Sequence, residues 1–344
     1  MGKKAGLIIQ YIIFLGGGIF LIWWQFSKMT PAEFEDFKFA LSNANYLVVI
    51  PIVFIALASH LSRAIRWRIM IEPMGYKPTL FNTFGVTMVG YLANTFLPRV
   101  GEILKCSLLG RYEKIPVQKL IGTIVAERVF DFVCYLLFGL FTFLIEYKLV
   151  GNFIKDTLFK KIAEKPEGLW VVTILFTIAI IVAVVLLLRF VFRKWTSTKI
   201  VLRIKNFLIG LREGVTSVLR LQKKWRFLFH TIFIWSMYLL QVYIGFSAIA
   251  DVSHLGFKAA CAVLTLAALA NIITPGGIGT FPTAIFLILS LYNINRTTGE
   301  AFGWLMWGVS TFIVLFFGLL FLGLLYFRNK EKQHNDILPK TITV

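Results

Sequence analysis

The sequence predicts an all-α polytopic membrane protein, and three observations support this fold class. Of the 344 residues, 58% are hydrophobic and only 15% are charged. Long apolar runs recur along the chain, and most basic residues flank those runs. A soluble domain of this length carries more charge, whereas helices that face lipid are apolar on all sides. We therefore expect a bilayer, and not water, to surround most of the chain.

The charge balance supports the same conclusion. Lysine and arginine number 36 against 17 acidic residues, which gives a formal net charge of +19. In a soluble protein such an excess would suggest nucleic acid as the partner. Here the basic residues flank apolar runs, so they are better explained by the positive-inside rule, and anionic lipid headgroups are the expected partner.

Six apolar runs are long enough to cross about 30 Å of hydrocarbon. They cover residues 7–24, 45–62, 120–145, 169–188, 227–250 and 300–327. The first run is expected to be retained, because no small-residue cleavage site follows it. Two further apolar regions, 79–112 and 256–293, are each interrupted by Pro, Gly and Asn, and their short arms predict re-entrant or broken-helix hairpins.

Loop charges test this assignment. The segment 189–226 holds eleven basic residues and one acid, Glu213, so its net charge is +10 and it should be cytoplasmic. If 79–112 enters and leaves by one face, every basic segment falls on the cytoplasmic side, together with both termini. The segment 189–226 also carries Trp195 and Trp225 among its basic residues. This pattern favours an amphipathic helix on the inner leaflet over a solvated loop.

The two hairpins share a pattern. The first contains Leu92-Ala93-Asn94 followed by Pro98, and the second contains Leu269-Ala270-Asn271 followed by Pro275. Each hairpin follows two spans and precedes one, and the crossings give the two hairpins opposite orientations. This indicates an inverted repeat, with halves at about 7–145 and 169–327. We expect one transmembrane domain, 1–327, and a short cytoplasmic tail, 328–344.

Ionisable residues inside apolar segments are candidates for function, because an unpaired charge in hydrocarbon is costly. They form two groups, one after the first hairpin break and one within the span 120–145. These residues are Arg99, Glu102 and Lys105, and Glu127, Arg128 and Asp131. Glu127 and Asp131 share a helical face, and Arg128 could pair with Asp131. The cluster could be an ion-pair network in which Arg99 and Arg128 neutralise the acids, or a polar cavity that holds a lipid headgroup.

Other candidates surround the breaks. The amides of Asn94 and Asn271 can satisfy backbone groups that the prolines leave free. Gly276 and Gly277 permit a tight turn whose N–H groups could approach a phosphate. Arg66, with Arg63 and Arg68 beside it, lies at the expected inner interface. Snorkelling is the default interpretation of these arginines, and holding a lipid phosphate is the alternative.

Signals for catalysis are weak. The four histidines and three cysteines match no metal spacing, and no nucleophile motif is visible. The glycine-rich loop lacks the lysine of a P-loop, which argues against nucleotide binding. We therefore expect no cofactor, no metal and no catalytic residues.

Four motifs together resemble a known family. They are residues 63–68 (RAIRWR), 94–102 (NTFLPRVGE), 126–131 (AERVFD) and 274–279 (TPGGIG). The chain is similar over nearly its whole length to the transmembrane domain of lysylphosphatidylglycerol synthases. This resemblance implies a prokaryotic cytoplasmic membrane protein, in which the domain moves aminoacylated phosphatidylglycerol between leaflets. A separate soluble domain performs the lysyl transfer in the complete synthases, so synthase activity is not expected of this chain alone. Many members carry an acid where this chain has Pro282.

Three functions remain open from the sequence. The first is a lipid flippase that moves a polar or anionic lipid between leaflets, with aminoacylated lipids included in this substrate class. The second is a membrane-embedded transferase acting on lipid or polyprenol carriers, with Glu127 or Asp131 as general base. The third is a scaffold that recruits a soluble lipid-modifying enzyme through 189–226. Self-association into a homo-oligomer is compatible with all three.

Overall fold

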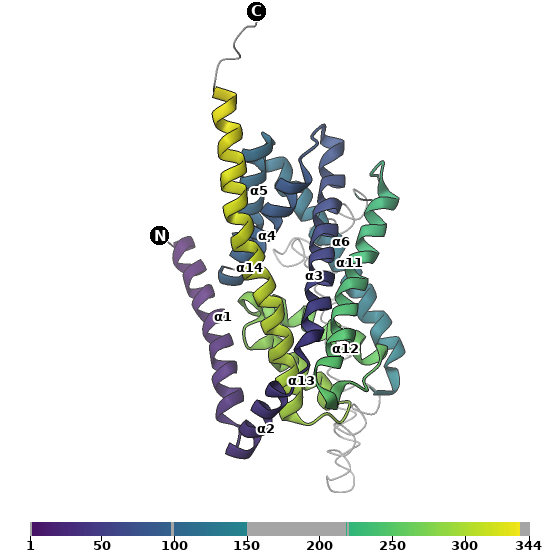
Figure 1. Ribbon diagram of the computed structural model, residues 1–344. Coiled ribbons are helices and arrows are strands. Elements are labelled where there is room, and N and C mark those ends of the chain that lie inside the picture. Colours follow the sequence, from purple (N-terminus) through teal and green to yellow (C-terminus); the bar gives the residue numbers. More distant parts are fainter. Residues whose placement is uncertain (1, 98–99, 150–217, 219, 338–344) are drawn as a thin grey trace, which may run out of the picture.

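The computed structural model describes residues 2–97, 100–149, 218 and 220–337, and every regular element in these ranges is helical (Figure 1). The first part contains α1 (Gly2–Ser27), α2 (Pro31–Ser42), α3 (Val49–Ile71), α4 (Leu80–Phe96), α5 (Val100–Glu113) and α6 (Val117–Ile145). The second part contains α11 (Lys224–Gly245), α12 (Phe257–Ile273), α13 (Thr280–Ser290) and α14 (Arg296–Ile337). The prediction of an all-α polytopic membrane protein is confirmed.

Four of the predicted spans correspond to helical segments that are long and apolar enough to cross a bilayer. These segments are Tyr46–Met74, Val117–Ile145, Lys224–Ala248 and Arg296–Lys330. The predicted span 7–24 lies within α1, and the predicted span 169–188 lies outside the described residues. Most of the segment 189–226 also lies outside them. Its end belongs to α11, so Trp225 is part of a transmembrane helix and not of a separate surface helix.

Helix α2 was not expected from the sequence, although its start carries a clear local signal. The Thr30 Oγ1 accepts a hydrogen bond from the Glu33 N–H at 3.2 Å, and the Glu33 carboxylate accepts one from the Thr30 N–H at 2.7 Å. Pro31 occupies the first helical position. This capping box fixes a short helix between α1 and α3.

The first predicted hairpin is formed by α4 and α5. Helix α4 ends because Leu97 is extended (φ −130°, ψ 104°), as expected for a residue that precedes proline. After the break, the Asn94 Oδ1 accepts a hydrogen bond from the Gly101 N–H at 2.8 Å. This contact confirms the predicted role of Asn94. A side chain at Gly101 would collide with the Gly90 carbonyl, so the two arms pack backbone to backbone.

The second predicted hairpin is formed by α12 and α13, joined by the 3₁₀ turn η6 (Pro275–Gly277). Gly276 (φ 58°) and Gly277 (φ 69°) have left-handed conformations that favour glycine. Two buried hydroxyls, those of Thr274 and Thr280, lie 2.6 Å apart across the turn. The Asn271 side chain lies against Gly277, where a Cβ would collide with its Oδ1. The role of Asn271 in satisfying freed backbone groups stays a prediction.

The tips of the two hairpins meet inside the bundle. A Cβ on Gly276 would lie 3.3 Å from the Thr95 Cγ2, and the Trp307 Nε1–H of α14 donates to the Gly276 carbonyl at 2.8 Å. In Figure 1 the α4–α5 hairpin occupies the upper part of the bundle and the α12–α13 hairpin the lower part. This is the arrangement that an inverted repeat predicts. The extent of the repeat halves stays a prediction.

Burial separates a packed interior from a lipid-facing exterior. One apolar cluster gathers residues of α11 to α14 around Phe246 and Phe302, and another gathers α3 to α6 around Trp67. Large apolar side chains elsewhere stay exposed, as Leu137 and Leu144 of α6 do. A bilayer would cover such surfaces, and the packed interior holds the charged residues described next.

Candidate functional site: a charged cluster beside a polar cavity

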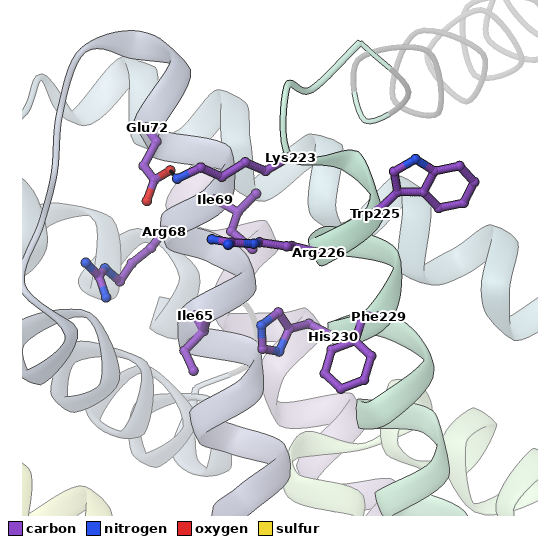
Figure 2. Close-up of a pocket in the computed structure, with 9 residues that line it drawn as sticks. All are labelled: Ile65, Arg68, Ile69, Glu72, Lys223, Trp225, Arg226, Phe229 and His230. Carbon is purple, nitrogen blue, oxygen red and sulfur yellow. Dashed lines mark hydrogen bonds and ion pairs between the residues drawn. The ribbon is translucent and has the colours of Figure 1, made fainter.

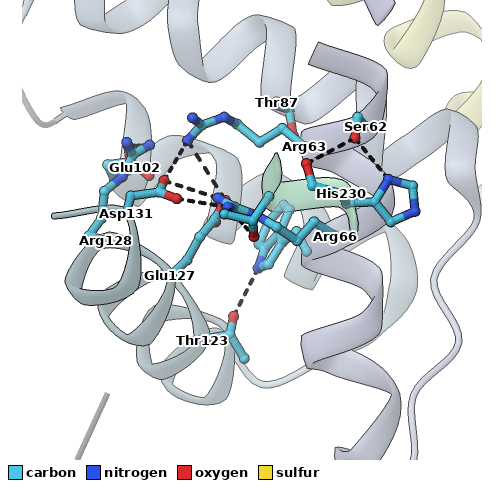
Figure 3. Close-up of polar contacts among 12 residues, drawn as sticks. Ser62, Arg63, Arg66, Thr87, Glu102, Thr123, Glu127, Arg128, Asp131 and His230 are labelled. Atoms are coloured by element: carbon cyan, nitrogen blue, oxygen red, sulfur yellow. Dashed lines mark hydrogen bonds and ion pairs between the residues drawn. The ribbon is translucent and has the colours of Figure 1, made fainter. Parts of the chain in front are cut away.

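Four charged side chains converge between α3 and α6 (Figure 3). Arg66 lies 2.7 Å from Glu127 and 2.7 Å from Asp131, and Arg63 lies 3.1 Å from Asp131. Arg66 and Glu127 are fully buried. Arg63 and Arg66 of α3 therefore each have a carboxylate partner on α6, which is the condition for holding these charges inside a membrane protein.

A second set of ion pairs joins α6 to the first hairpin. Arg128 lies 2.6 Å from the Glu102 carboxylate, and Lys105 lies 3.0 Å from the same group. The Lys105 ammonium also lies 4.9 Å from the centre of the Trp67 ring, a cation–π contact with α3. Glu102 thus connects α5 to α6 just after the helix break.

Helix α11 completes the cluster from the other side. The Thr231 hydroxyl accepts a hydrogen bond from Arg66 at 3.1 Å, and the Tyr238 hydroxyl accepts one from Arg63 at 3.0 Å. Charged hydrogen bonds of this kind are short and directional, so they fix both guanidinium groups. The cluster therefore couples three helices, α3, α6 and α11, to the first hairpin.

A cavity of about 390 Å³ lies where the cluster meets the two hairpin tips. It is lined by residues of α3, α4, α6, α11, α12, η6, α13 and α14, and these include His60, Arg63, Tyr91, Asn94, Thr95, Arg128, Tyr238, Asn271, Gly276 and Trp307. Three buried lining atoms have no hydrogen-bond partner among the described residues: the His60 Nδ1, the Arg63 Nε and the Tyr91 hydroxyl. Polar and charged side chains from several helices surround this space, so the cavity is suited to a polar occupant.

The charge around the cavity favours an anionic occupant. Among the described residues, the cluster holds four cationic side chains, Arg63, Arg66, Lys105 and Arg128, and three acids, Glu102, Glu127 and Asp131. The cluster therefore has a net charge of +1. Arg128 is the most exposed of the four cations, with 43% of its side chain accessible, and it lines the cavity.

The structure brings most of the predicted site residues together. Glu102, Glu127, Arg128, Asp131 and Arg66 form the cluster, while Asn94, Asn271 and Gly276 line the adjoining cavity. Gly277 is buried in the turn next to them. Arg99 lies outside the described residues.

One pairing of the predicted network was wrong, because Asp131 pairs with the α3 arginines and not with Arg128. Arg128 does pair with Glu102, as the predicted network included. The default interpretation of Arg63 and Arg66 as snorkelling anchors was also wrong. Helix α3 continues to Ile71, well beyond the predicted span, and this places both arginines inside the bundle.

Sequence reasoning missed the uncharged polar lining. Tyr91, Tyr238 and Trp307 carry no formal charge and lie in otherwise apolar helices, so a search for intramembrane charges does not find them. His60 lay within a predicted span, but it was considered only as a metal ligand or as part of a catalytic motif. No group of three or more potential metal ligands occurs among the described residues. Pro282 of α13 packs against Gly303 of α14.

Comparison with known proteins places the chain in a family. The family model of the lysylphosphatidylglycerol synthase TM region matches residues 7–318. A UPF0104 membrane protein from Methanocaldococcus jannaschii is 26% identical over an alignment that covers 76% of this chain and 79% of that relative. No solved structure matches the chain. Because the family model covers most of the sequence, the chain belongs to the lysylphosphatidylglycerol synthase transmembrane region family.

Proposed function

We propose that the chain moves a phospholipid with an anionic or strongly polar headgroup between the leaflets of a prokaryotic cytoplasmic membrane. The cavity between the hairpin tips is the observation that carries this proposal. Its polar and cationic lining suits a phosphate-bearing headgroup. The exposed apolar surface of the surrounding helices leaves the acyl chains in lipid. An aminoacylated headgroup, as the family name suggests, is one member of this substrate class.

The cluster supports translocation better than catalysis. A general base must reach the proton that it removes. Glu127 is fully buried against Arg66, and neither Glu127 nor Asp131 lines the cavity. Arg63 and Arg128 do line it, so the cavity presents cations to the occupant while the acids hold those cations in place.

Basic residues gather at the ends of α3, α11 and α14 that lie near one another, and by the positive-inside rule this end is cytoplasmic.

Reconstitution into liposomes tests the proposal. Purified protein is incorporated with fluorescent phosphatidylglycerol, phosphatidylethanolamine, phosphatidylcholine or lysylphosphatidylglycerol, and leaflet exchange is followed by quenching from outside. We expect exchange above that of empty liposomes. Arg128→Gln should reduce the rate by tenfold or more, because it removes the exposed cation of the cavity.

Arg328→Gln is the matched control. Arg328 is exposed on α14 and contacts the Phe81 ring, away from the cavity, so its loss should leave exchange unchanged. Exchange equal to that of empty liposomes for all four headgroups would overturn the proposal. Product formation from an added aminoacyl or glycosyl donor, abolished by Asp131→Asn, would indicate a transferase in its place.

A further inference from the structure

A second groove, of about 580 Å³, lies between α3 and α11 on the outside of the bundle (Figure 2). It is lined by Ile65, Arg68, Ile69, Glu72, Lys223, Trp225, Arg226, Phe229 and His230. None of these residues lines the cavity between the hairpin tips. The groove is therefore a separate feature of the molecule.

The lining changes from apolar to charged along one direction. Helices α3 and α11 run antiparallel, so Ile65 lies at the level of Phe229, and Glu72 lies beside Lys223 at the other end (Figure 2). Trp225 is 75% exposed near the charged end, as tryptophans at a membrane–water interface often are. An apolar floor with a charged end matches a phospholipid that lies along the helices with its headgroup at the interface.

The charged end has an excess of unpaired cations. Glu72 is the single acid of the groove, and Lys223 occupies it through an ion pair. The side chains of Arg68 and Arg226 make no hydrogen bond or ion pair with any other described residue, and the buried Arg68 Nε has no partner. His230 shares its Nδ1 with the Ser62 hydroxyl at 2.8 Å, which leaves its Nε2 available. Guanidinium groups at an interface bind phosphate oxygens in preference to neutral groups.

We propose that this groove binds one anionic phospholipid from the leaflet that faces the basic end of the bundle. Arg226 holds the phosphate, Arg68 adds positive charge at the same end of the groove, and one acyl chain lies over Ile65, Ile69 and Phe229. The lipid here is a bound partner at the periphery and is not the translocated substrate, so the proposal stands independently of the transport role. Because the groove lies between α3 and α11, bound lipid contacts both helices and stabilises their packing, which holds Arg66 of α3 next to Thr231 of α11.

Native mass spectrometry of the full chain in detergent tests the groove. Phosphatidylglycerol and phosphatidylcholine with identical acyl chains are titrated separately, and the first bound lipid is quantified. We expect tighter binding of phosphatidylglycerol, and a loss of about fivefold in affinity for each arginine removed in Arg226→Gln and in Arg68→Gln/Arg226→Gln. Arg226→Lys should recover part of the loss, since it keeps the charge. These variants should leave leaflet exchange by the cavity intact.

Lys224→Gln is the matched control, because Lys224 is exposed at the same end of α11 but does not line the groove. An equal loss in Lys224→Gln would show that bulk charge, and not the groove, attracts the lipid. Unchanged affinity in the double arginine variant would also overturn the proposal. So would displacement of the lipid by glycerol 3-phosphate at similar concentration, since the site would then recognise a free phosphate. A thermal melt of each variant confirms that it is folded.

Discussion

Removing Arg66 should destabilise the protein more than removing any surface cation. Arg66 is fully buried and contacts two carboxylates at 2.7 Å, so Arg66→Met leaves Glu127 and Asp131 with Arg63 alone between them. Arg63 lies 3.8 Å from Glu127, too far to replace the lost pair. Breaking a buried ion pair from one side costs about 3–5 kcal/mol, and the loss of a partner by both acids places this substitution at the upper end, although Asp131 keeps Arg63 at 3.1 Å.

A double-mutant cycle isolates the ion pair. Arg66→Met, Glu127→Gln and the double variant are unfolded by sodium dodecyl sulfate in mixed micelles, and the free energy of unfolding is compared with that of the wild type. Glu127→Gln alone should cost less, about 1–3 kcal/mol, because Arg66 keeps its contact with Asp131. The double variant should lose less than the sum of the single losses, by about 1–3 kcal/mol.

Arg328→Met is the control for this cycle. Arg328 is exposed and contacts only the Phe81 ring among the interactions described, so its loss should cost at most about 1 kcal/mol. If Arg66→Met costs no more than Arg328→Met, or if the single losses add without coupling, the buried cluster does not hold α3 to α6 in the way argued above.

Three further predictions concern the hairpins. Gly101→Ala should lower the free energy of unfolding by about 1–3 kcal/mol, because the added methyl group meets the backbone of the facing arm. In Gly122→Ala the methyl group meets nothing within 4 Å, so this control should be neutral or slightly stabilising. Chemical unfolding of both variants distinguishes the two outcomes. Gly276→Ala should cost about 1–2 kcal/mol for its left-handed conformation and should slow lipid exchange, and normal exchange at full stability would contradict this. With the native cysteines replaced by serine, Arg111→Cys and Asn293→Cys should react with an impermeant thiol reagent from opposite faces of the membrane, and labelling from one face would refute the opposed hairpins.

The sequence alone was sufficient to locate the helix breaks and the intramembrane acids. Proline, glycine and ionisable residues in apolar runs are properties of single positions, and they do not depend on the tertiary fold. The partners of those acids could not be found in the same way. Arg66 and Glu127 are 61 residues apart, and their contact exists only because α3 packs against α6. The length of α3 was the decisive unknown, since it determines whether Arg63 and Arg66 reach the interface or the interior.

The cavity lining shows a similar limit. Tyr91 and Tyr238 acquire their importance from facing a common space, which no periodicity along one helix reveals. The two asparagines beside the helix breaks, Asn94 and Asn271, illustrate what the sequence can and cannot predict. Asn94 was correctly expected to satisfy a freed backbone group, because its partner Gly101 lies on the other side of the same break. Asn271 lies against Gly277 and lines the cavity, and these contacts arise from the folded turn and the packing of several helices, so the sequence alone did not reveal them.

The contact between Thr95 and Gly276 at the hairpin tips bears on how the membrane potential would act on a charged headgroup. The four hairpin helices α4, α5, α12 and α13 have 17, 14, 17 and 11 residues, so each is shorter than about 30 Å at 1.5 Å per residue and none of the four crosses the bilayer by itself. Moving one charge through 100 mV changes its energy by about 2.3 kcal/mol. An anionic headgroup passing between these two residues would therefore move at a rate that depends on voltage, and an energised membrane with a negative interior would favour its movement outward.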